Sequence, residues 1–240
     1  MANRLNTQRR RLLGSTALAG LGMLDLSRVA YASAAPQAAS SHRTVSATSL
    51  GPIHQIETGT LSIGYAQMGP TDGTVVILLH GWPHDIHSFV EVAPMLAAAG
   101  YRVIVPYLRG YGPTRILSAN TARNGQQAIF AVDVIALMDA LKIDNAVLAG
   151  FDWGGRAAEI VAAIWPNRCR ALVCASGYLI GSQDAYRQPQ SPQAELQAWF
   201  QYYFATERGA AGYAAYRDEF NKTIWRNASP QFKFDDATFL

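Results

Sequence analysis

One strand-to-helix junction constrains the fold of this chain more than any other feature. An apolar run at residues 146–149 leads directly into the sequence Gly150-Phe151-Asp152-Trp153-Gly154-Gly155. Glycines two positions before and two positions after Asp152 leave room for a strand and a helix to close around one residue with a strained backbone. The segment therefore predicts a nucleophile elbow, a sharp turn that lifts the Asp152 carboxylate above the end of a buried strand.

The elbow also predicts a chemistry for Asp152. Residues 156–165 have the apolar spacing of a helix, with Ile160, Val161 and Ile164 on one face. Asp152 then lies near a helix N-terminus, where unpaired amides favour an anion. A carboxylate attacks saturated carbon without a base to deprotonate it, so an alkyl-ester intermediate is expected. An aspartate that only caps the helix is the alternative, but capping requires neither the glycines nor the apolar run.

A second motif follows another predicted strand. The continuous apolar run at residues 74–79 is typical of a strand buried on both faces of a parallel sheet, and it ends in His80-Gly81-Trp82-Pro83. When water adds to an ester, the oxygen that becomes negative needs fixed N–H donors. We expect the backbone amides of Trp82 and Trp153 to be that pair of donors.

Strands and helices alternate between these motifs. Residues 53–57 and 61–68 are predicted to form an antiparallel hairpin, because a Thr-Gly-Thr turn separates them. Further strands are expected at 75–79, 101–105 and 171–175, and helices at 89–99 and around Phe130, Val134, Leu137 and Leu141. Such alternation predicts an α/β fold with a mostly parallel sheet and crossover helices.

The motifs resemble those of the α/β-hydrolase superfamily, and specifically its epoxide hydrolase and haloalkane dehalogenase branch. The resemblance rests on the two motifs above and on Leu108-Arg109-Gly110-Tyr111-Gly112, and it covers residue 53 to the C-terminus. It implies an α/β-hydrolase fold, with a mostly parallel sheet and a helical cap, and hydrolysis through an ester on Asp152.

Two positions distinguish the reactions of this branch. Dehalogenases often place a halide-binding Asn after the His-Gly pair, whereas Trp82 resembles the aromatic residue of epoxide hydrolases. Fluoroacetate-type dehalogenases carry one Arg directly after the nucleophile and another four positions beyond it; here Trp153 takes the first place and Arg156 the second. The resemblance implies an epoxide hydrolase-type enzyme, with a haloalkane or haloacid dehalogenase as the alternative.

Residues 178–240 are predicted to be a helical cap segment that excludes water from the pocket. Their composition changes to Gln, Tyr, Trp and Ala, and helices are expected at 193–204 and 210–224.

The resemblance implies that cap tyrosines donate hydrogen bonds to the epoxide oxygen. Weak candidates are Tyr202 and Tyr203, followed by Tyr213 and Tyr216, while Phe200 occupies the place where the family's first cap tyrosine is expected. Aromatic residues at helical spacing also fit simple packing, which remains the alternative.

The histidine of the family's triad has no counterpart by position. In this branch the order is nucleophile, acid, histidine, and the histidine activates the water that cleaves the ester. All five histidines precede Asp152: His42, His54, His80, His84 and His87. We therefore expect a fragment in which the catalytic acid, the histidine and the last strands of the sheet are absent. A third interpretation is a catalytically incomplete fragment that binds small apolar molecules.

The first 34 residues are predicted to be a twin-arginine export signal. Arg9-Arg10-Arg11 precedes a weakly apolar stretch at residues 12–24, and Ala30-Tyr31-Ala32 offers a cleavage site. Residues 35–52 have the composition of a linker, so the expected domains are a hydrolase core at 53–177 and an incomplete cap at 178–240. The protein is expected in the periplasm or secreted, and at the membrane only transiently during export.

Charge and composition predict a small-molecule enzyme. The first 34 residues hold five arginines and one aspartate, a charge of +4, so the rest of the chain carries −1 of the total of +3. No basic surface for nucleic acid is implied. His84 and His87 beside Asp85 lack a third metal ligand, and the sequence has no dinucleotide or phosphate loop. We expect neither a metal nor a cofactor, and a small apolar substrate as the partner.

Overall fold

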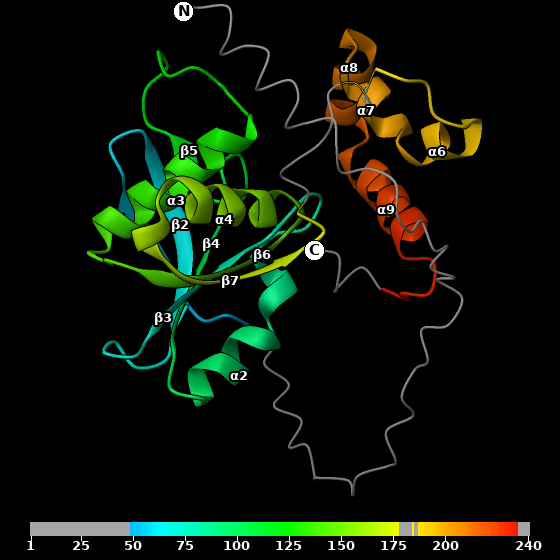
Figure 1. The fold of residues 1–240 in the computed structure, drawn as a ribbon. Coiled ribbons are helices and arrows are strands. Elements are labelled where there is room, and N and C mark those ends of the chain that lie inside the picture. Colours follow the sequence, from blue (N-terminus) through cyan, green and yellow to red (C-terminus); the bar gives the residue numbers. More distant parts are fainter. Residues whose placement is uncertain (1–48, 178–183, 185–186, 235–240) are drawn as a thin grey trace, which may run out of the picture. The chain divides into compact units, whose positions relative to one another are not determined.

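The computed structural model describes residues 49–177, 184 and 187–234 (Figure 1). The predicted export signal and parts of the predicted linker and cap lie outside the described residues. The strands are β1 Ile53–Glu57, β2 Leu61–Met68, β3 Val75–Leu79, β4 Arg102–Pro106, β5 Arg115–Ile116, β6 Ala146–Phe151 and β7 Cys169–Ala175. The helices are α2 Val92–Ala98, α3 Gln127–Ala140, α4 Asp152–Ile164, α6 Pro192–Gln197, α7 Trp199–Phe204, α8 Glu207–Ala215 and α9 Arg217–Ala228, with short 3-10 turns at Ile86–Phe89 and Pro166–Arg168.

The strands form one mixed sheet in the order β1-β2-β4-β3-β6-β7, with β5 paired to β2. The run from β4 through β3 and β6 to β7 is parallel. The β1-β2 hairpin is antiparallel, and β2 is also antiparallel to β4 and β5. The predicted hairpin and the predicted mostly parallel sheet with crossover helices are confirmed. The two-residue strand β5 was not predicted.

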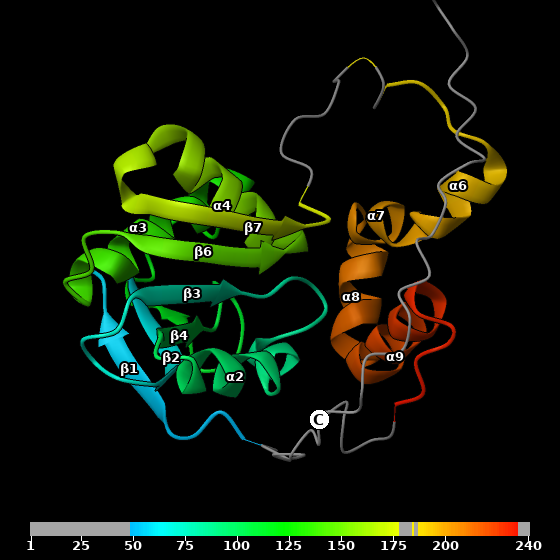
Figure 2. The same ribbon diagram turned by 60° about the horizontal axis from the view of Figure 1, so that its bottom comes forward.

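Helices cover both faces of the sheet because β3 is apolar on both sides. Ile77 and Leu79 belong to a core cluster with residues of α3 and α4, whereas Val76 and Leu78 belong to a second cluster with Ala93 of α2. Successive side chains of a strand point to opposite faces, so the continuous apolar run supplies both clusters. Figures 1 and 2 show α3 and α4 on one face of the sheet and α2 on the other.

The observed α4 differs from the predicted helix at both ends. It begins at Asp152 instead of residue 156, so Asp152 is part of its first turn. Ile164, predicted to share a face with Ile160 and Val161, is 62 % exposed, whereas those two are buried. Ile164 is the last residue of α4, and its neighbour Trp165 packs against the core cluster instead.

The structure has four short helices where the sequence predicts two longer cap helices. The predicted helix 193–204 is divided at Ala198 into α6 and α7, and the predicted helix 210–224 is divided at Tyr216 into α8 and α9. The Thr206 side chain accepts a hydrogen bond from the Gly209 amide, which caps α8 and fixes its start.

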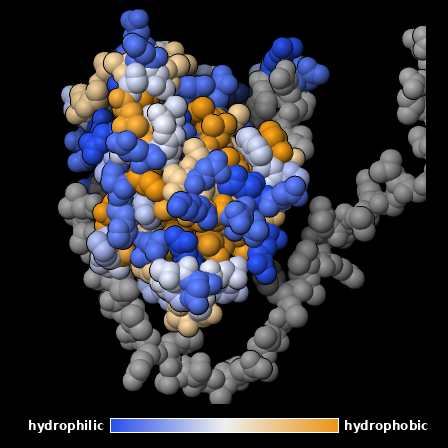
Figure 3. Space-filling view, turned by 90° about the vertical axis from the view of Figure 1, so that its left-hand side faces the viewer, coloured by the Kyte–Doolittle hydropathy of each residue, from blue (hydrophilic) through white to orange (hydrophobic). Residues whose placement is uncertain are grey.

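The β7 strand lies at the edge of the sheet and is poorly covered. Leu172 is 40 % exposed and Val173 is 62 % exposed. On a different face, at the left of Figure 1, hydrophobic residues are interspersed with hydrophilic ones (Figure 3). Within the described residues, no helix is long and apolar enough to cross a membrane.

Candidate active site

The junction between β6 and α4 has the geometry of the predicted elbow. Asp152 has a φ of 49°, a conformation that side chains rarely adopt. A Cβ atom on Gly150 would lie 2.7 Å from the carbonyl carbon of Gly154, and one on Gly154 would lie 2.2 Å from the carbonyl oxygen of Leu79. Both positions therefore require glycine, because the elbow is in contact with itself and with the end of β3.

The parallel register of β3 and β6 brings the second motif to Asp152. Leu79 is paired with Gly150, so Gly81 and Asp152, each two residues further on, meet at the same edge of the sheet. The Trp82 amide donates a hydrogen bond to Asp152 Oδ1 at 3.0 Å. A Cβ atom on Gly81 would lie 2.5 Å from Asp152 Cβ, so this close approach depends on a glycine.

Trp153, the second expected amide donor, lies in the first turn of α4. Amides of a first helical turn have no acceptor within the helix, so they are available to an anion at that end. The Trp153 ring packs against Phe130 of α3, with ring centroids 5.5 Å apart. The Arg156 guanidinium lies over the same ring, 4.8 Å from its centroid. The indole and Arg156 therefore form part of the wall beside the elbow.

His80 connects two loops as a neutral imidazole. Its side chain is fully buried, and burial lowers its pKa to about 4. Nε2 accepts a hydrogen bond from the Leu108 amide at 3.1 Å, so Nδ1 carries the proton, 3.3 Å from the Gly81 carbonyl oxygen. Both ring nitrogens are thus engaged with backbone. His80 holds the loop that carries Trp82 and is not arranged as a base.

The loop that contains Leu108-Arg109-Gly110-Tyr111-Gly112 is attached to α3 by an ion pair between Arg109 and Asp133. Arg109 Nε and Nη2 donate to the two Asp133 carboxylate oxygens at 2.8 and 2.7 Å, and both side chains are nearly buried. Burial raises the pKa of the Asp133 carboxyl, and the hydrogen bonds and charge of Arg109 oppose that rise. Arg109 therefore has a structural role here.

Aromatic residues of the cap pack on the motif loop. The Trp82 ring lies 5.1 Å from Phe200, 5.8 Å from Phe204 and 6.2 Å from Phe220, measured between centroids. Phe200, which occupies the expected place of a cap tyrosine, is therefore a packing partner of Trp82. Trp82 thus holds Asp152 Oδ1 through its backbone amide while its ring lies among apolar cap rings, in keeping with an apolar substrate.

The two tyrosines favoured by the sequence contact other groups of the cap. Tyr202 is 61 % exposed, and its hydroxyl donates to the Glu195 carboxylate. The Tyr203 ring stacks on Phe220 with its hydroxyl against Gly212. Tyr216 is 63 % exposed. The hydroxyl neighbours that the structure gives Tyr202 and Tyr203 are thus Glu195 and Gly212, and not Asp152.

Tyr111 lies close enough to Asp152 and to Tyr213 for their charges to act on its phenol. Burial raises the pKa of the Tyr111 phenol, and the proximity of Tyr213 and then Asp152 raises it further. The Tyr111 ring packs edge-on against His80, with centroids 4.6 Å apart. The sequence favours Tyr202 over Tyr213 and gives Tyr111 no predicted role. The position of Tyr111 in the Gly110-Tyr111-Gly112 motif was the only sequence signal.

Two further histidines of the described residues, His84 and His87, lie near Asp85. Burial lowers the pKa of His84, whose ring packs on Trp225 with centroids 4.5 Å apart. Asp85 and Asp152 partly oppose that shift through their charges. His87 Nδ1 lies 2.9 Å from Asp85 Oδ1 at the surface. Within the part of the chain that the structure describes, no three His, Cys, Asp or Glu side chains could jointly hold a metal ion.

Comparison with known proteins places these features in a family. Residues 74–238 match the family described as the alpha/beta hydrolase fold. The crystal structure of a candidate epoxide hydrolase from Klebsiella pneumoniae is 60 % identical, with a TM-score of 0.77, and the match covers 81 % of this chain and 64 % of that one.

Curated relatives match over shorter segments. Epoxide hydrolase B of Mycobacterium tuberculosis is 34 % identical in an alignment 149 residues long, and the match covers 57 % of this chain and 41 % of that protein. A haloalkane dehalogenase of Mycobacterium marinum is 35 % identical in an alignment 127 residues long, and the match covers 51 % of this chain and 41 % of that protein. The chain spans about two fifths of the length of these relatives.

Proposed function

The chain belongs to the alpha/beta hydrolase fold family, and we propose that it performs the nucleophilic half of an epoxide hydrolase reaction. The observation that supports this most is the strained backbone of Asp152, whose Oδ1 accepts a hydrogen bond from the Trp82 amide nitrogen 3.0 Å away. A carboxylate held by one oxygen at a helix N-terminus has its other oxygen available for attack. The epoxide hydrolase relatives support the same assignment.

In the proposed first step, Asp152 Oδ2 attacks one carbon of the epoxide ring. The bond between that carbon and the ring oxygen breaks, and its electron pair stays on the oxygen as an alkoxide. The new C–O bond makes an ester in which Oδ1 is the carbonyl oxygen. The Trp82 amide already points at Oδ1, so it can hold the same atom when water later adds to the ester.

The alkoxide must take a proton as the ring opens, and we assign this to Tyr213 with Tyr111 beside it. Tyr213 belongs to α8 and Tyr111 to the loop that packs on His80. Beyond the effect of burial, the charges of Tyr213 and Asp152 both raise the pKa of Tyr111, which supports a common site. The Tyr202 hydroxyl donates to the Glu195 carboxylate, whereas the Tyr213 hydroxyl donates to the neutral side-chain oxygen of Asn221 at 3.4 Å, a longer bond that is more easily exchanged for one to the alkoxide.

The second half-reaction needs a base that activates water. His80 is occupied by the Leu108 amide and the Gly81 carbonyl, and no histidine follows Asp152 in the sequence. The resemblance assigns this role to a late histidine. We therefore propose that this chain forms the ester and does not hydrolyse it.

Dehalogenation is the second candidate, since a haloalkane dehalogenase is among the relatives. Trp82 in place of a halide-binding Asn favours the epoxide. The Arg156 guanidinium, which a haloacid would need, stacks on Trp153. A domain that binds apolar molecules without any bond formation is the non-enzymatic alternative.

Intact-mass measurement after incubation with styrene oxide tests the proposal. We expect one covalent adduct per chain, mapped to Asp152 by peptide sequencing and absent in Asp152→Asn. Asp72→Asn, which changes an exposed carboxylate in a turn, is the matched control and should react like the wild type. A parallel incubation with a bromoalkane should release little halide. Faster halide release would favour the dehalogenase, and no adduct with either reagent would favour binding alone.

A further inference from the structure

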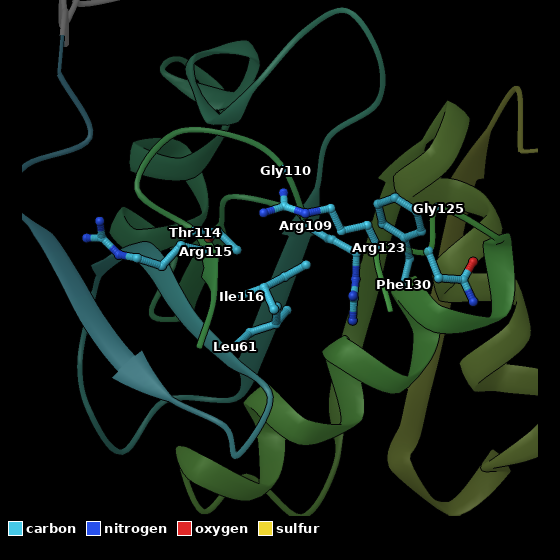
Figure 4. Close-up of a pocket in the computed structure, with 10 residues that line it drawn as sticks. Leu61, Arg109, Gly110, Thr114, Arg115, Ile116, Arg123, Gly125 and Phe130 are labelled. Carbon is cyan, nitrogen blue, oxygen red and sulfur yellow. The ribbon is translucent and has the colours of Figure 1, made fainter. Parts of the chain in front are cut away.

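A second hollow lies apart from the Asp152 site. It has a volume of about 420 Å3 and lies between the loop after Arg109, strand β5 and the start of α3 (Figure 4). Neither Asp152 nor Trp82 lines it. We call it the arginine pocket because three arginines, Arg109, Arg115 and Arg123, line it. The apolar side chains of Leu61, Ile116 and Phe130 line it as well.

The arginine pocket carries positive charge that the described residues do not neutralise. Arg109 is paired with Asp133, but Arg115 and Arg123 are exposed and form no ion pair within residues 49–177 and 187–234. None of the residues that line the pocket is acidic. Figure 4 shows Arg109, Arg115 and Arg123 among the side chains that line the pocket, with Arg115 farthest to the left.

The start of α3 adds to this positive potential. Its N-cap residue, Gln126, makes no side-chain hydrogen bond to the helix, and Asn124 and Gly125 line the pocket directly before it. First-turn amides without a cap attract an anion. The helix is 14 residues long, so its dipole acts in the same direction as the two arginines.

The floor of the arginine pocket is apolar. Leu61 is fully buried, Phe130 is nearly so, and Ile116 packs against the same core cluster. A ligand that fits this lining needs an apolar body against the floor and an anionic group at the rim. Arginine prefers carboxylate because its planar fork can donate two parallel hydrogen bonds.

We propose that the arginine pocket binds a small organic carboxylate with an apolar body, at a site separate from Asp152. A volume of about 420 Å3 is within the usual range for small-molecule sites. An alkylamine would be repelled by Arg115 and Arg123. A neutral alcohol would gain only the contact with the floor.

The probe is hexanoate, titrated against the full chain by ligand-detected NMR, which does not require a monomeric protein. Hexan-1-ol and hexylamine are the neutral and cationic probes of the same length. We expect saturable binding of hexanoate, weaker by about tenfold or more in Arg115→Gln/Arg123→Gln. The matched control, Arg170→Gln/Arg208→Gln, removes two exposed arginines elsewhere and should bind within about twofold of the wild type.

Two further variants locate the bound probe. Ile116→Trp should fill the floor and abolish binding, whereas Asp152→Asn should leave the affinity for hexanoate within about twofold. Equal binding of hexanoate and hexan-1-ol, an unchanged affinity in Arg115→Gln/Arg123→Gln, or an equal loss in the control pair would overturn the proposal. So would a large change in Asp152→Asn, because the probe would then occupy the elbow.

Discussion

The contact between Gly81 and Asp152 makes Gly81→Ala the sharpest test of the elbow. An alanine Cβ would lie 2.5 Å from Asp152 Cβ, 2.8 Å from Oδ1 and 3.0 Å from the Phe151 carbonyl oxygen. Real contacts of this kind are longer, so either the loop or the Asp152 side chain must move. The hydrogen bond from the Trp82 amide to Oδ1 would then lengthen or break.

The expected magnitude follows from that one hydrogen bond. A hydrogen bond to a charged group contributes about 1.5–3 kcal/mol. If it orients Oδ2 for attack, its loss should slow alkylation of Asp152 by about 10- to 150-fold. Removal of a single oxyanion donor in other hydrolases costs about 100- to 1000-fold, so a larger effect is compatible with the same cause.

The assay is the rate of adduct formation at a fixed epoxide concentration, followed by intact mass. Gly125→Ala is the matched control, since a Cβ atom there meets nothing within 4 Å and its φ is not positive. Circular dichroism and a urea melt establish that each variant is folded. A folded Gly81→Ala that is alkylated within about threefold of the wild-type rate would refute the role of the Trp82 amide.

Four further predictions concern separate parts of the molecule. Tyr213→Phe should slow alkylation by an epoxide by about tenfold or more, whereas Tyr202→Phe should not; equal rates would contradict the assigned proton donor. Because burial lowers the pKa of His80 to about 4, the unfolded chain binds that proton more tightly, and the free energy of unfolding should decrease between about pH 6.5 and 4 by up to about 3 kcal/mol. Urea melts across this range check it, and a flat profile would count against the buried neutral imidazole. The exposed β7 edge should cause self-association that Val173→Lys reduces in size-exclusion chromatography, and a clean, cooperative wild-type monomer would show that the edge is adequately covered. Finally, N-terminal sequencing of periplasmic protein should begin at Ser33 or Ala35, and uncleaved cytoplasmic protein in both wild type and Arg10→Lys would contradict export.

The central strands were predictable because their signals are local. The hairpin β1-β2 and strand β3 have the predicted bounds, since a glycine turn and a continuous apolar run define them. The elbow was predictable for a related reason, as Gly150 and Gly154 are required by contacts within a few residues and with β3.

Other features depend on contacts that a linear pattern does not contain. The cap helices divide at Ala198 and Tyr216, where neither glycine nor proline marks an end. Strand β5 has two residues and is held by pairing with β2. Tyr202 and Tyr213 look alike in sequence, and only the folded chain shows that the Tyr202 hydroxyl donates to the Glu195 carboxylate, whereas Tyr213 donates to Asn221 and raises the pKa of Tyr111 beyond the effect of burial.

The pairing of Leu79 with Gly150 also sets the order in which the site can form during synthesis. Trp82 and Asp152 are 70 residues apart in the sequence. Because ribosomes add about 5–20 residues per second, Trp82 is synthesised roughly 4–14 s before Asp152. A slip of one residue between β3 and β6 would displace the two groups by about 3.3 Å, enough to break their hydrogen bond. Covalent labelling of Asp152 on nascent chains would therefore report the moment at which β3 and β6 reach their native register.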